Sequence, residues 1–178
     1  MSTPKEQPKR NPLLDKIKKA KEFTLEEAVV SAQADAERKA EEKEEAAFQK
    51  RQEEFRIERM KASGLQDRYL HDYTFANDKG YNPEIDKARE YVAQWKEMKK
   101  NCIGLLLWGD VGTGKTFIAA CIANALIEQG VPVLMTNFSK ILNQLSAMFN
   151  EDRNKYIESM NSYSLLIIDD LGIERNSE

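Results

Sequence analysis

Cysteine and histidine are scarce in this chain, which has two cysteines and one histidine among its 178 residues. Cys102, Cys121 and His71 are scattered along the chain, and their spacing excludes a typical zinc motif. Long apolar runs are also missing, because none approaches the roughly 18–20 residues of a membrane-spanning helix. The polar N-terminus shows no secretory signal. We therefore expect a cytoplasmic, reduced protein with no membrane partner.

Charge is abundant but nearly balanced, with a formal net charge of -3 and a pI near 5.5. This balance gives no global attraction to nucleic acid. Residues 1–62 contain 15 Lys+Arg and 14 Asp+Glu, so this segment cannot build an apolar core, whereas residues 63–178 can. Basic residues dominate the very start of the chain, and we expect residues 1–23 to be a disordered basic tail.

Residues 24–64 are expected to form a charged helical arm that ends at its terminal glycine. Thr24 and Glu27 have the spacing of a capping box, and good helix formers follow them. Phe48 and Phe55 are seven residues apart, but charged residues at the intervening positions argue against a coiled coil. Two interpretations stay open: a solvated helix without a partner, or a docking arm for another protein.

Residues 65–178 predict one α/β domain. An aromatic-rich linker at 68–82 precedes a helix with Asn82 as its N-cap and Pro83 at its first position. Three later apolar runs are typical of buried strands, and three other stretches are typical of helices. The predicted strands cover 103–108, 131–136 and 165–168, and the predicted helices cover 116–129, 139–149 and 152–161. This order indicates a parallel sheet with flanking helices.

A complete phosphate-binding loop, Gly-Asp-Val-Gly-Thr-Gly-Lys-Thr, occupies residues 109–116 between a predicted strand and a predicted helix. Its glycines let the backbone approach a phosphate closely, and the helix N-terminus attracts the anion. Lys115 is expected to neutralise the β- and γ-phosphates, and the Thr116 hydroxyl to ligate Mg²⁺. The predicted nucleotide-binding residues are Gly109, Asp110, Val111, Gly112, Thr113, Gly114, Lys115, Thr116 and Phe117. The loop therefore predicts a nucleoside triphosphate, ATP, bound with Mg²⁺.

Paired carboxylates, Asp169 and Asp170, follow the last predicted strand. Ligands bind at the C-terminal edge of parallel strands, so these carboxylates are expected to face the phosphate loop. We expect Asp169 to hold Mg²⁺ and Asp170 to orient or deprotonate the attacking water. An alternative for Asp170 is a cap of the turn after the strand. The predicted catalytic set is Lys115, Asp169 and Asp170.

The loop, the helix after it and especially Leu-Leu-Ile-Ile-Asp-Asp-Leu-Gly-Ile-Glu at 165–174 resemble the AAA+ ATPases of the DnaC/DnaI type and their relative IstB. The resemblance covers roughly residues 65–178. It implies an AAA+ P-loop domain that loads or remodels the replicative DNA helicase in DNA replication, with ATP as the switch. It also implies that the N-terminal arm grips the hexameric helicase. A transposition helper ATPase of the IstB kind is the alternative.

The resemblance further implies that the region at 137–161 contacts single-stranded DNA. Lys140, Arg153 and Lys155 are the basic candidates, and Tyr156 could stack on a base. The alternative is an ordinary solvated surface. Relatives of this class form rings or spirals, which makes self-association a further candidate interaction.

The chain departs from the family pattern in two ways. Many relatives carry a cysteine-rich metal site near the N-terminus, and here no cysteine precedes Cys102. The sequence also stops at Glu178, before the later strands, the sensor residue, the arginine finger and the helical lid of the family. In this class a later strand lies between the loop strand and the Asp-Asp strand, so we expect an incomplete sheet with two open edges.

An incomplete domain is expected to hydrolyse ATP weakly, because an arginine finger typically contributes about 10³–10⁵ in rate. A third interpretation therefore stays open beside the two ATPase readings. It is a non-catalytic, partner-binding fragment that keeps the arm and has lost useful turnover.

Overall fold

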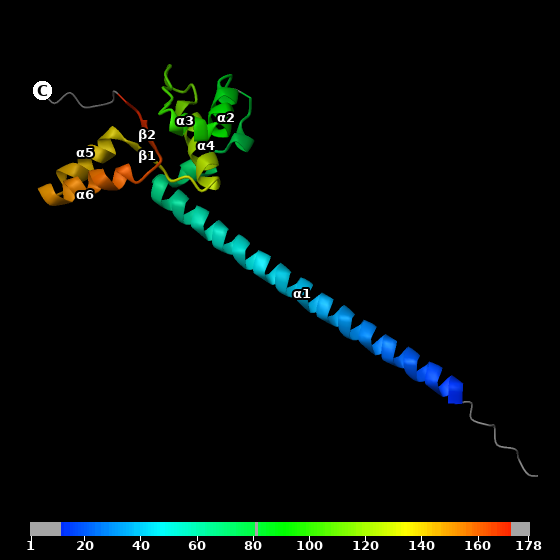
Figure 1. Ribbon diagram of the computed structural model, residues 1–178. Helices are drawn as coiled ribbons and strands as arrows, with labels where there is room; N and C mark the ends of the chain where they lie inside the picture. Colours follow the sequence, from blue (N-terminus) through cyan, green and yellow to red (C-terminus); the bar gives the residue numbers. More distant parts are fainter. Residues whose placement is uncertain (1–11, 81, 172–178) are drawn as a thin grey trace, which may run out of the picture. The chain divides into compact units, whose positions relative to one another are not determined.

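The computed structural model describes residues 12–80 and 82–171 (Figure 1). The chain divides into two compact units, residues 1–52 and 53–178, and each is considered by itself. The expected disorder of residues 1–11 lies outside the described residues. Within the described ranges, no helix is both long and apolar enough to cross a membrane.

The helical arm is a single α-helix, α1 (Pro12–Gly64), which begins twelve residues earlier than the predicted N-cap at Thr24. Residues 12–23, expected within the disordered tail, are therefore helical. Thr24 is an interior residue whose hydroxyl donates to the carbonyl oxygen of Lys21 at 3.1 Å, so the capping-box prediction is wrong. The physical reason is that proline is tolerated in a first helical turn, and Lys and Leu residues after it favour the helix.

The first unit exposes nearly all of its described side chains. Ion pairs three or four residues apart support the helix locally, as between Arg38 and both Asp35 (3.2 Å) and Glu42 (3.8 Å). Phe48 is 56 % exposed, although phenylalanine favours burial. This part of α1 therefore presents isolated apolar groups on a charged surface.

The last turns of α1 belong to the second unit. Ile57 and Met60 pack against the apolar core, and Lys61 pairs with Glu128 at 3.0 Å. Leu65, directly after the helix, is 1 % exposed and forms an isolated parallel bridge with Met135. The compact second unit therefore starts before residue 65, where the sequence pattern suggested a boundary.

The linker forms two short 3₁₀ turns, η1 (Arg68–Asp72) and η2 (Phe75–Asn77), followed by α2 (Ile85–Ala93) and α3 (Trp95–Lys100). The predicted helix is thus present, but it begins after Glu84 and is interrupted at Gln94. Asn82 is not its N-cap; the Asn82 carbonyl accepts from the N–H of Ile85 at 3.2 Å in the preceding turn.

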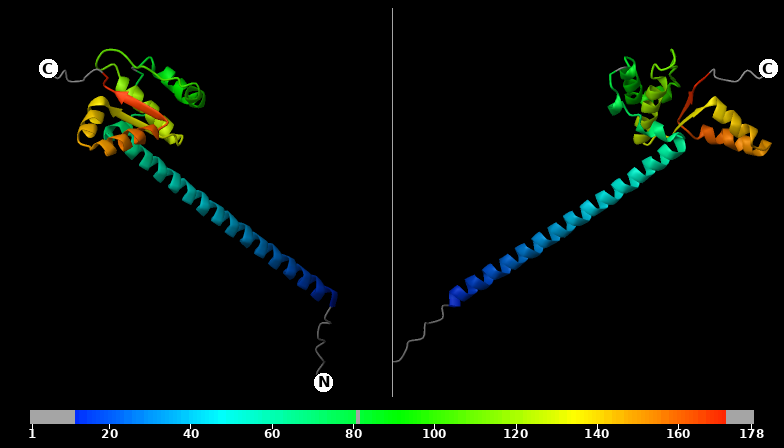
Figure 2. Two further views of the ribbon diagram at one scale, coloured as in Figure 1. Left: turned by 60° about the vertical axis from the view of Figure 1, so that its left-hand side comes forward. Right: turned by 180° about the vertical axis from the view of Figure 1, so that it is seen from behind.

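The remaining elements follow the predicted order: α4 (Lys115–Glu128), β1 (Val133–Asn137), α5 (Phe138–Ser146), α6 (Asn150–Asn161) and β2 (Leu165–Asp169). The two strands are parallel, and their register pairs Val133 with Leu165 and Asn137 with Asp169. Figures 1 and 2 show α5 and α6 on one side of the strands and α2, α3 and α4 on the other. The expected α/β layering is present in a small, helix-rich form.

The core surrounds α4. Its residues Ala120, Ala123, Leu126 and Ile127 are fully buried, because the helix is covered by α2, β1 and the linker. A helix that is apolar on all sides fits only a central position. This burial holds α4, and the loop that precedes it, in a defined place.

Residues 103–108, predicted as a strand, are not a strand in the structure. Leu106 is 78 % exposed and Trp108 is 86 % exposed. A cleft of about 700 Å³ lies between residues 104–109 and β2. The two segments are therefore too far apart to pair as neighbouring strands. A β-strand requires a paired neighbour, and an apolar run alone cannot supply one.

Candidate functional site

The phosphate-binding loop is bent by left-handed backbone conformations. Gly112 has φ 84° and Gly114 has φ 85°, values that residues with a Cβ rarely adopt. Gly114 is the N-cap of α4, and its carbonyl accepts from the N–H of Ile118 at 2.9 Å. A Cβ on Gly114 would also collide with the side chain of Asn82. The glycines therefore allow the loop to wrap the N-terminus of α4.

Lys115 is held by the loop itself. Its ammonium donates to the carbonyl oxygens of Gly109 at 3.0 Å and Asp110 at 2.8 Å. The Thr113 hydroxyl donates to the same Asp110 carbonyl at 2.9 Å. Asp110 and Thr113 thus act as internal supports of the loop. The positive charge of Lys115 lies beside the helix N-terminus, where an anion is favoured.

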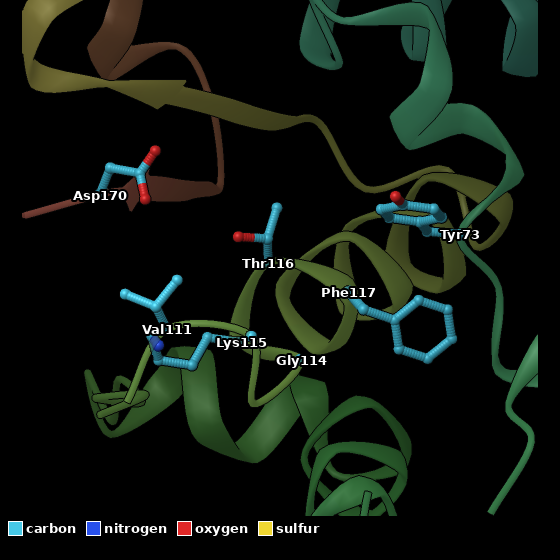
Figure 3. Close-up of a pocket in the computed structure, with 8 residues that line it drawn as sticks. Tyr73, Val111, Gly114, Lys115, Thr116, Phe117 and Asp170 are labelled. Atoms are coloured by element: carbon cyan, nitrogen blue, oxygen red, sulfur yellow. The ribbon is translucent and has the colours of Figure 1, made fainter. Parts of the chain in front are cut away.

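A cavity of about 330 Å³ opens beside the loop (Figure 3). The residues that line it are Tyr73, Val111, Gly112, Gly114, Lys115, Thr116, Phe117 and Asp170. All but Tyr73 belong to the predicted site. The predicted residues Gly109 and Asp169 do not line this cavity; they line the neighbouring cleft beside β2. The structure therefore places Asp170 in the cavity beside the loop, and both paired carboxylates line the adjoining cleft together with Gly109 and Lys115.

The two paired carboxylates occupy different surroundings. Asp169 ends β2 and is paired with Asn137 in the parallel register. Asp170 follows in the left-handed region with φ 54°, a conformation that Asp tolerates better than most residues. Figure 3 shows the Asp170 carboxylate and the Thr116 hydroxyl on the same side of the cavity. The turn after β2 therefore brings Asp170 to the cavity, whereas Asp169 lines the adjoining cleft together with Gly109 and Lys115 of the loop.

Asp169 contributes to the electrostatics of a nearby tyrosine. Burial is the main cause that raises the pKa of Tyr69, and the negative charges of Asp67 and Asp169 add to it. Lys140 opposes this shift. The phenol of Tyr69 therefore stays neutral near this acidic strand end, and Asp169 lies within electrostatic reach of the linker.

Tyr73 is the site residue that sequence reasoning missed. Its ring lies against that of Phe117, with 5.3 Å between centroids and an interplanar angle of 58°. Tyr69 continues the group, with its ring 5.7 Å from that of Tyr73. The aromatic-rich composition of residues 68–82 was the available signal, but nothing in the linear sequence placed it beside the loop. The cavity thus has a charged end and an aromatic end.

The donor set fits a nucleoside triphosphate with Mg²⁺. An ammonium, a helix N-terminus and glycine backbone groups suit phosphate oxygens, while a hydroxyl and a carboxylate suit Mg²⁺. Among the described residues, no three His, Cys, Asp or Glu side chains gather into a metal site of their own. Mg²⁺ commonly binds through one or two protein oxygens together with substrate phosphates, and this cavity offers that arrangement.

The candidates for DNA contact make interactions within the chain. Lys140 pairs with Asp67 at 2.6 Å, and Lys155 pairs with Asp152 at 3.4 Å. Arg153 donates from Nε to backbone carbonyls at the end of α5. Tyr156 is half-buried, and its burial raises the pKa of its phenol. Each basic group therefore has a local role, and DNA contact stays a prediction.

A parallel strand pair, a glycine-rich loop at the N-terminus of a buried helix and a carboxylate facing that loop together define a P-loop nucleotide-binding protein. The model of the IstB-like ATP binding protein family matches residues 16–177. The chain therefore belongs to this family.

Three curated relatives illustrate the similarity. YdaV, an uncharacterized protein of Escherichia coli K12, is 27% identical over 133 residues, which are 70% of this chain and 52% of YdaV. The replicative helicase loader DnaC of the same organism is 29% identical over 97 residues, 53% of this chain and 38% of DnaC. DnaC of Buchnera aphidicola subsp. Baizongia pistaciae is 26% identical over 123 residues, 65% of this chain and 48% of that protein.

The chain spans about half, or less, of the length of these relatives. No solved structure matches the chain. The comparisons therefore establish the family, and the activity and partners of this chain are matters for proposal.

Proposed function

We propose that this chain binds Mg·ATP beside its phosphate loop and that the nucleotide controls an interaction with the hexameric replicative DNA helicase. The proposal rests on one observation, the meeting of Lys115, Thr116 and Asp170 in a single cavity. The similarity to proteins named replicative helicase loader supports helicase loading as the use of that site.

Each group in the cavity has a role that suits its chemistry. Lys115 offsets the negative charge of the β- and γ-phosphates. The Thr116 hydroxyl and the Asp169 carboxylate would hold Mg²⁺, which would screen the phosphate charge. Asp170 faces the loop and is the candidate to orient an attacking water.

The aromatic end of the cavity suits the nucleobase. Tyr73 and Phe117 line the cavity together with Lys115, and Figure 3 shows their rings away from Asp170. A planar base gains stacking energy on such rings, whereas phosphates belong at the charged end. The nucleotide is therefore expected to lie with its phosphates at the loop and its base toward Tyr73.

The arm is the proposed helicase-binding element. Its described part carries exposed apolar residues, including Phe48, on a helix that is otherwise charged. Exposed phenylalanines on a helix are typical of protein docking surfaces. A deletion that tests this role should stop at residue 52, because Ile57 and Met60 pack against the core of the second unit.

Light scattering on a sizing column tests the proposal directly. The full chain is mixed with the replicative helicase of its host, with and without Mg·ATP, and we expect a larger complex whose amount depends on the nucleotide. Phe48→Glu should weaken that complex, while the matched control Gln49→Glu adds the same charge beside it and should not. Normal complex formation by the chain lacking residues 1–52 would refute the arm assignment.

The transposition helper is the alternative, favoured by the match to the IstB-like family. It predicts binding to a transposase or to double-stranded DNA, with no helicase complex. The third alternative, a non-catalytic partner-binding fragment, is distinguished from both by the absence of ATP turnover. Helicase binding without measurable ATP hydrolysis at high protein concentration would favour that reading over an active loader.

Single-stranded DNA contact through α5 and α6 is a secondary proposal. Lys155→Ala and Arg153→Ala should each lower the salt dependence of DNA binding if these side chains neutralise phosphates. Because both side chains also make internal contacts, the fold of each variant must be checked by circular dichroism. An unchanged salt slope in folded variants would exclude this contact.

A further inference from the structure

We propose that Asn124 is a positioning residue of the nucleotide site, because its buried amide holds the linker backbone and so places the Tyr73 ring at the cavity. The inference rests on the proposed function, since it concerns how the base-binding end of the ATP site is held. Asn124 itself does not line the cavity.

Asn124 is a buried polar residue in the apolar middle of α4. It is 1 % exposed, and its neighbours in α4, Ala123 and Leu126, are fully buried. A buried amide is costly unless it is hydrogen-bonded, so its partners indicate its purpose. Its Nδ2 lies within hydrogen-bonding distance of the carbonyl oxygens of Leu70 at 2.8 Å, Tyr73 at 2.9 Å and Ala120 at 3.0 Å, which share its two hydrogens.

The three acceptors define the orientation of the amide. Only the NH₂ group can face three carbonyl oxygens, because an oxygen in that place would meet three acceptors. Oδ1 of Asn124 consequently points elsewhere, and it has no partner among the described residues. A leucine at this position would avoid the unpaired oxygen. We therefore attribute the presence of an asparagine here to the hydrogen bonds that its Nδ2 makes with the linker backbone.

The carbonyls of Leu70 and Tyr73 lie at the two ends of one tight turn. The N–H of Tyr73 donates to the carbonyl of Leu70 at 3.2 Å, which closes the turn, and Asn124 holds both carbonyls. Short 3₁₀ turns have poor hydrogen-bond geometry and little stability of their own. The position of the Tyr73 backbone, and with it the ring beside Phe117, therefore depends on the amide of Asn124.

Helix α4 connects the Asn124 hydrogen bonds to the phosphate end of the site. Its first turn carries Lys115, Thr116 and Phe117, and Asn124 follows about two turns later on the same buried helix. One rigid element thus carries the phosphate-binding residues and the anchor of the aromatic wall. The helix sets the separation between the two ends of the cavity, which suits a ligand with a charged end and a planar end.

The test compares two ligands on the full chain. Mg·ATP carries a base, whereas Mg·tripolyphosphate carries only the charged part. A residue that positions the Tyr73 ring should therefore change the affinity for Mg·ATP and not the affinity for Mg·tripolyphosphate. We expect Asn124→Leu to weaken Mg·ATP binding about tenfold, the size of a lost stacking contact, and to leave Mg·tripolyphosphate binding unchanged. Tyr73→Ala should show the same pattern. The double variant should be no weaker than Tyr73→Ala, because the two residues act through one contact.

Ile127→Thr is the control for a general disturbance of α4, since it changes a fully buried residue of the same helix and leaves the hydrogen bonds from Asn124 to the linker in place. It should leave the ratio of the two affinities unchanged. An equal loss of affinity for both ligands in Asn124→Leu would overturn the inference in favour of a purely structural role. Additive losses of Mg·ATP affinity in the double variant would do the same. Should Asn124→Leu fail to fold, Asn124→Ala removes the donating NH₂ without placing an oxygen against the linker carbonyls, and it should show the same selective loss of Mg·ATP binding. Wild-type protein that binds neither ligand would instead refute the proposed function.

Discussion

The ammonium nitrogen of Lys115 lies 2.8 Å from the carbonyl oxygen of Asp110, within the loop that carries both residues. The Thr113 hydroxyl shares this carbonyl, so one acceptor joins the lysine to the loop's own scaffold. The contact keeps the cation at the N-terminus of α4, next to the cavity. The lysine is thus both a structural support of the loop and its main positive charge.

Removal of this charge should disable nucleotide binding. We expect Lys115→Ala to weaken Mg·ATP binding by about 10- to 100-fold, because charge-assisted hydrogen bonds to the phosphates are lost. Isothermal titration calorimetry measures this affinity directly. Lys87→Ala removes the same charge from a lysine whose side chain is 79% exposed, and it should bind normally. Wild-type affinity in Lys115→Ala would mean that the loop does not receive the phosphates.

A pair of glycine substitutions tests the packing of the end of α1. A Cβ on Gly64 would collide with the carbonyl oxygen of Val133, a backbone atom that cannot move aside cheaply. Gly64→Ala should therefore lower the free energy of unfolding by about 1–3 kcal/mol. A Cβ on Gly104 meets nothing within 4 Å, so Gly104→Ala should be close to neutral. Urea denaturation of both variants checks the difference, and equal stabilities would contradict the described packing.

The buried thiol of Cys121 should make stability fall in alkali. Burial, with a smaller contribution from Asp78, raises the pKa of this thiol from its ordinary value of 9.0 to about 12. The unfolded chain therefore loses this proton at lower pH than the folded chain does. Stability from this group is complete below about pH 9 and is lost as the pH rises toward 12, by up to about 1.4 kcal/mol per pH unit.

Comparison of wild type with Cys121→Ala isolates this effect, because other alkaline titrations occur in both proteins. The free energy of unfolding, measured at about pH 8 and about pH 10, should fall more steeply in the wild type. Parallel pH dependences would show that the thiol is not shielded. Cys102, which is exposed, should react readily with a thiol reagent in the folded protein, while Cys121 should react only on unfolding.

Arg153 should contribute to stability through the end of α5. Its Nε donates to the carbonyl oxygens of Leu145 at 2.8 Å and Met148 at 3.1 Å, which satisfies carbonyls at a helix C-terminus. We expect Arg153→Ala to lower the free energy of unfolding by about 1 kcal/mol and to speed hydrogen exchange in α5 and α6. Lys155→Ala, whose pair is exposed, should change stability by less than about 0.5 kcal/mol. Equal stability of Arg153→Ala and Lys155→Ala would contradict this capping role of Arg153.

Much of the site could be predicted from the sequence because its chemistry lies in contiguous residues. The loop at 109–116 contains both its glycines and its cation, and the structure gathers most of the predicted residues into one cavity. The helices of the second unit and β1 and β2 were also predictable, since apolar periodicity and runs report local burial. That Asp170 lines the cavity while Asp169 lines only the adjoining cleft was not predictable in this way, because the difference arises from the turn after β2.

The sequence by itself determined the phosphate loop, the acidic strand end and the family to which the chain belongs. Tertiary structure alone decided that residues 103–108 do not form a strand, because strand formation depends on a neighbouring edge and not on the apolar run. It also decided that Tyr73 reaches the nucleotide cavity, since that contact joins residues far apart in sequence. Asn124 illustrates the physical reason. No sequence pattern marks this asparagine, and only folding brings the carbonyls of Leu70 and Tyr73 to its amide.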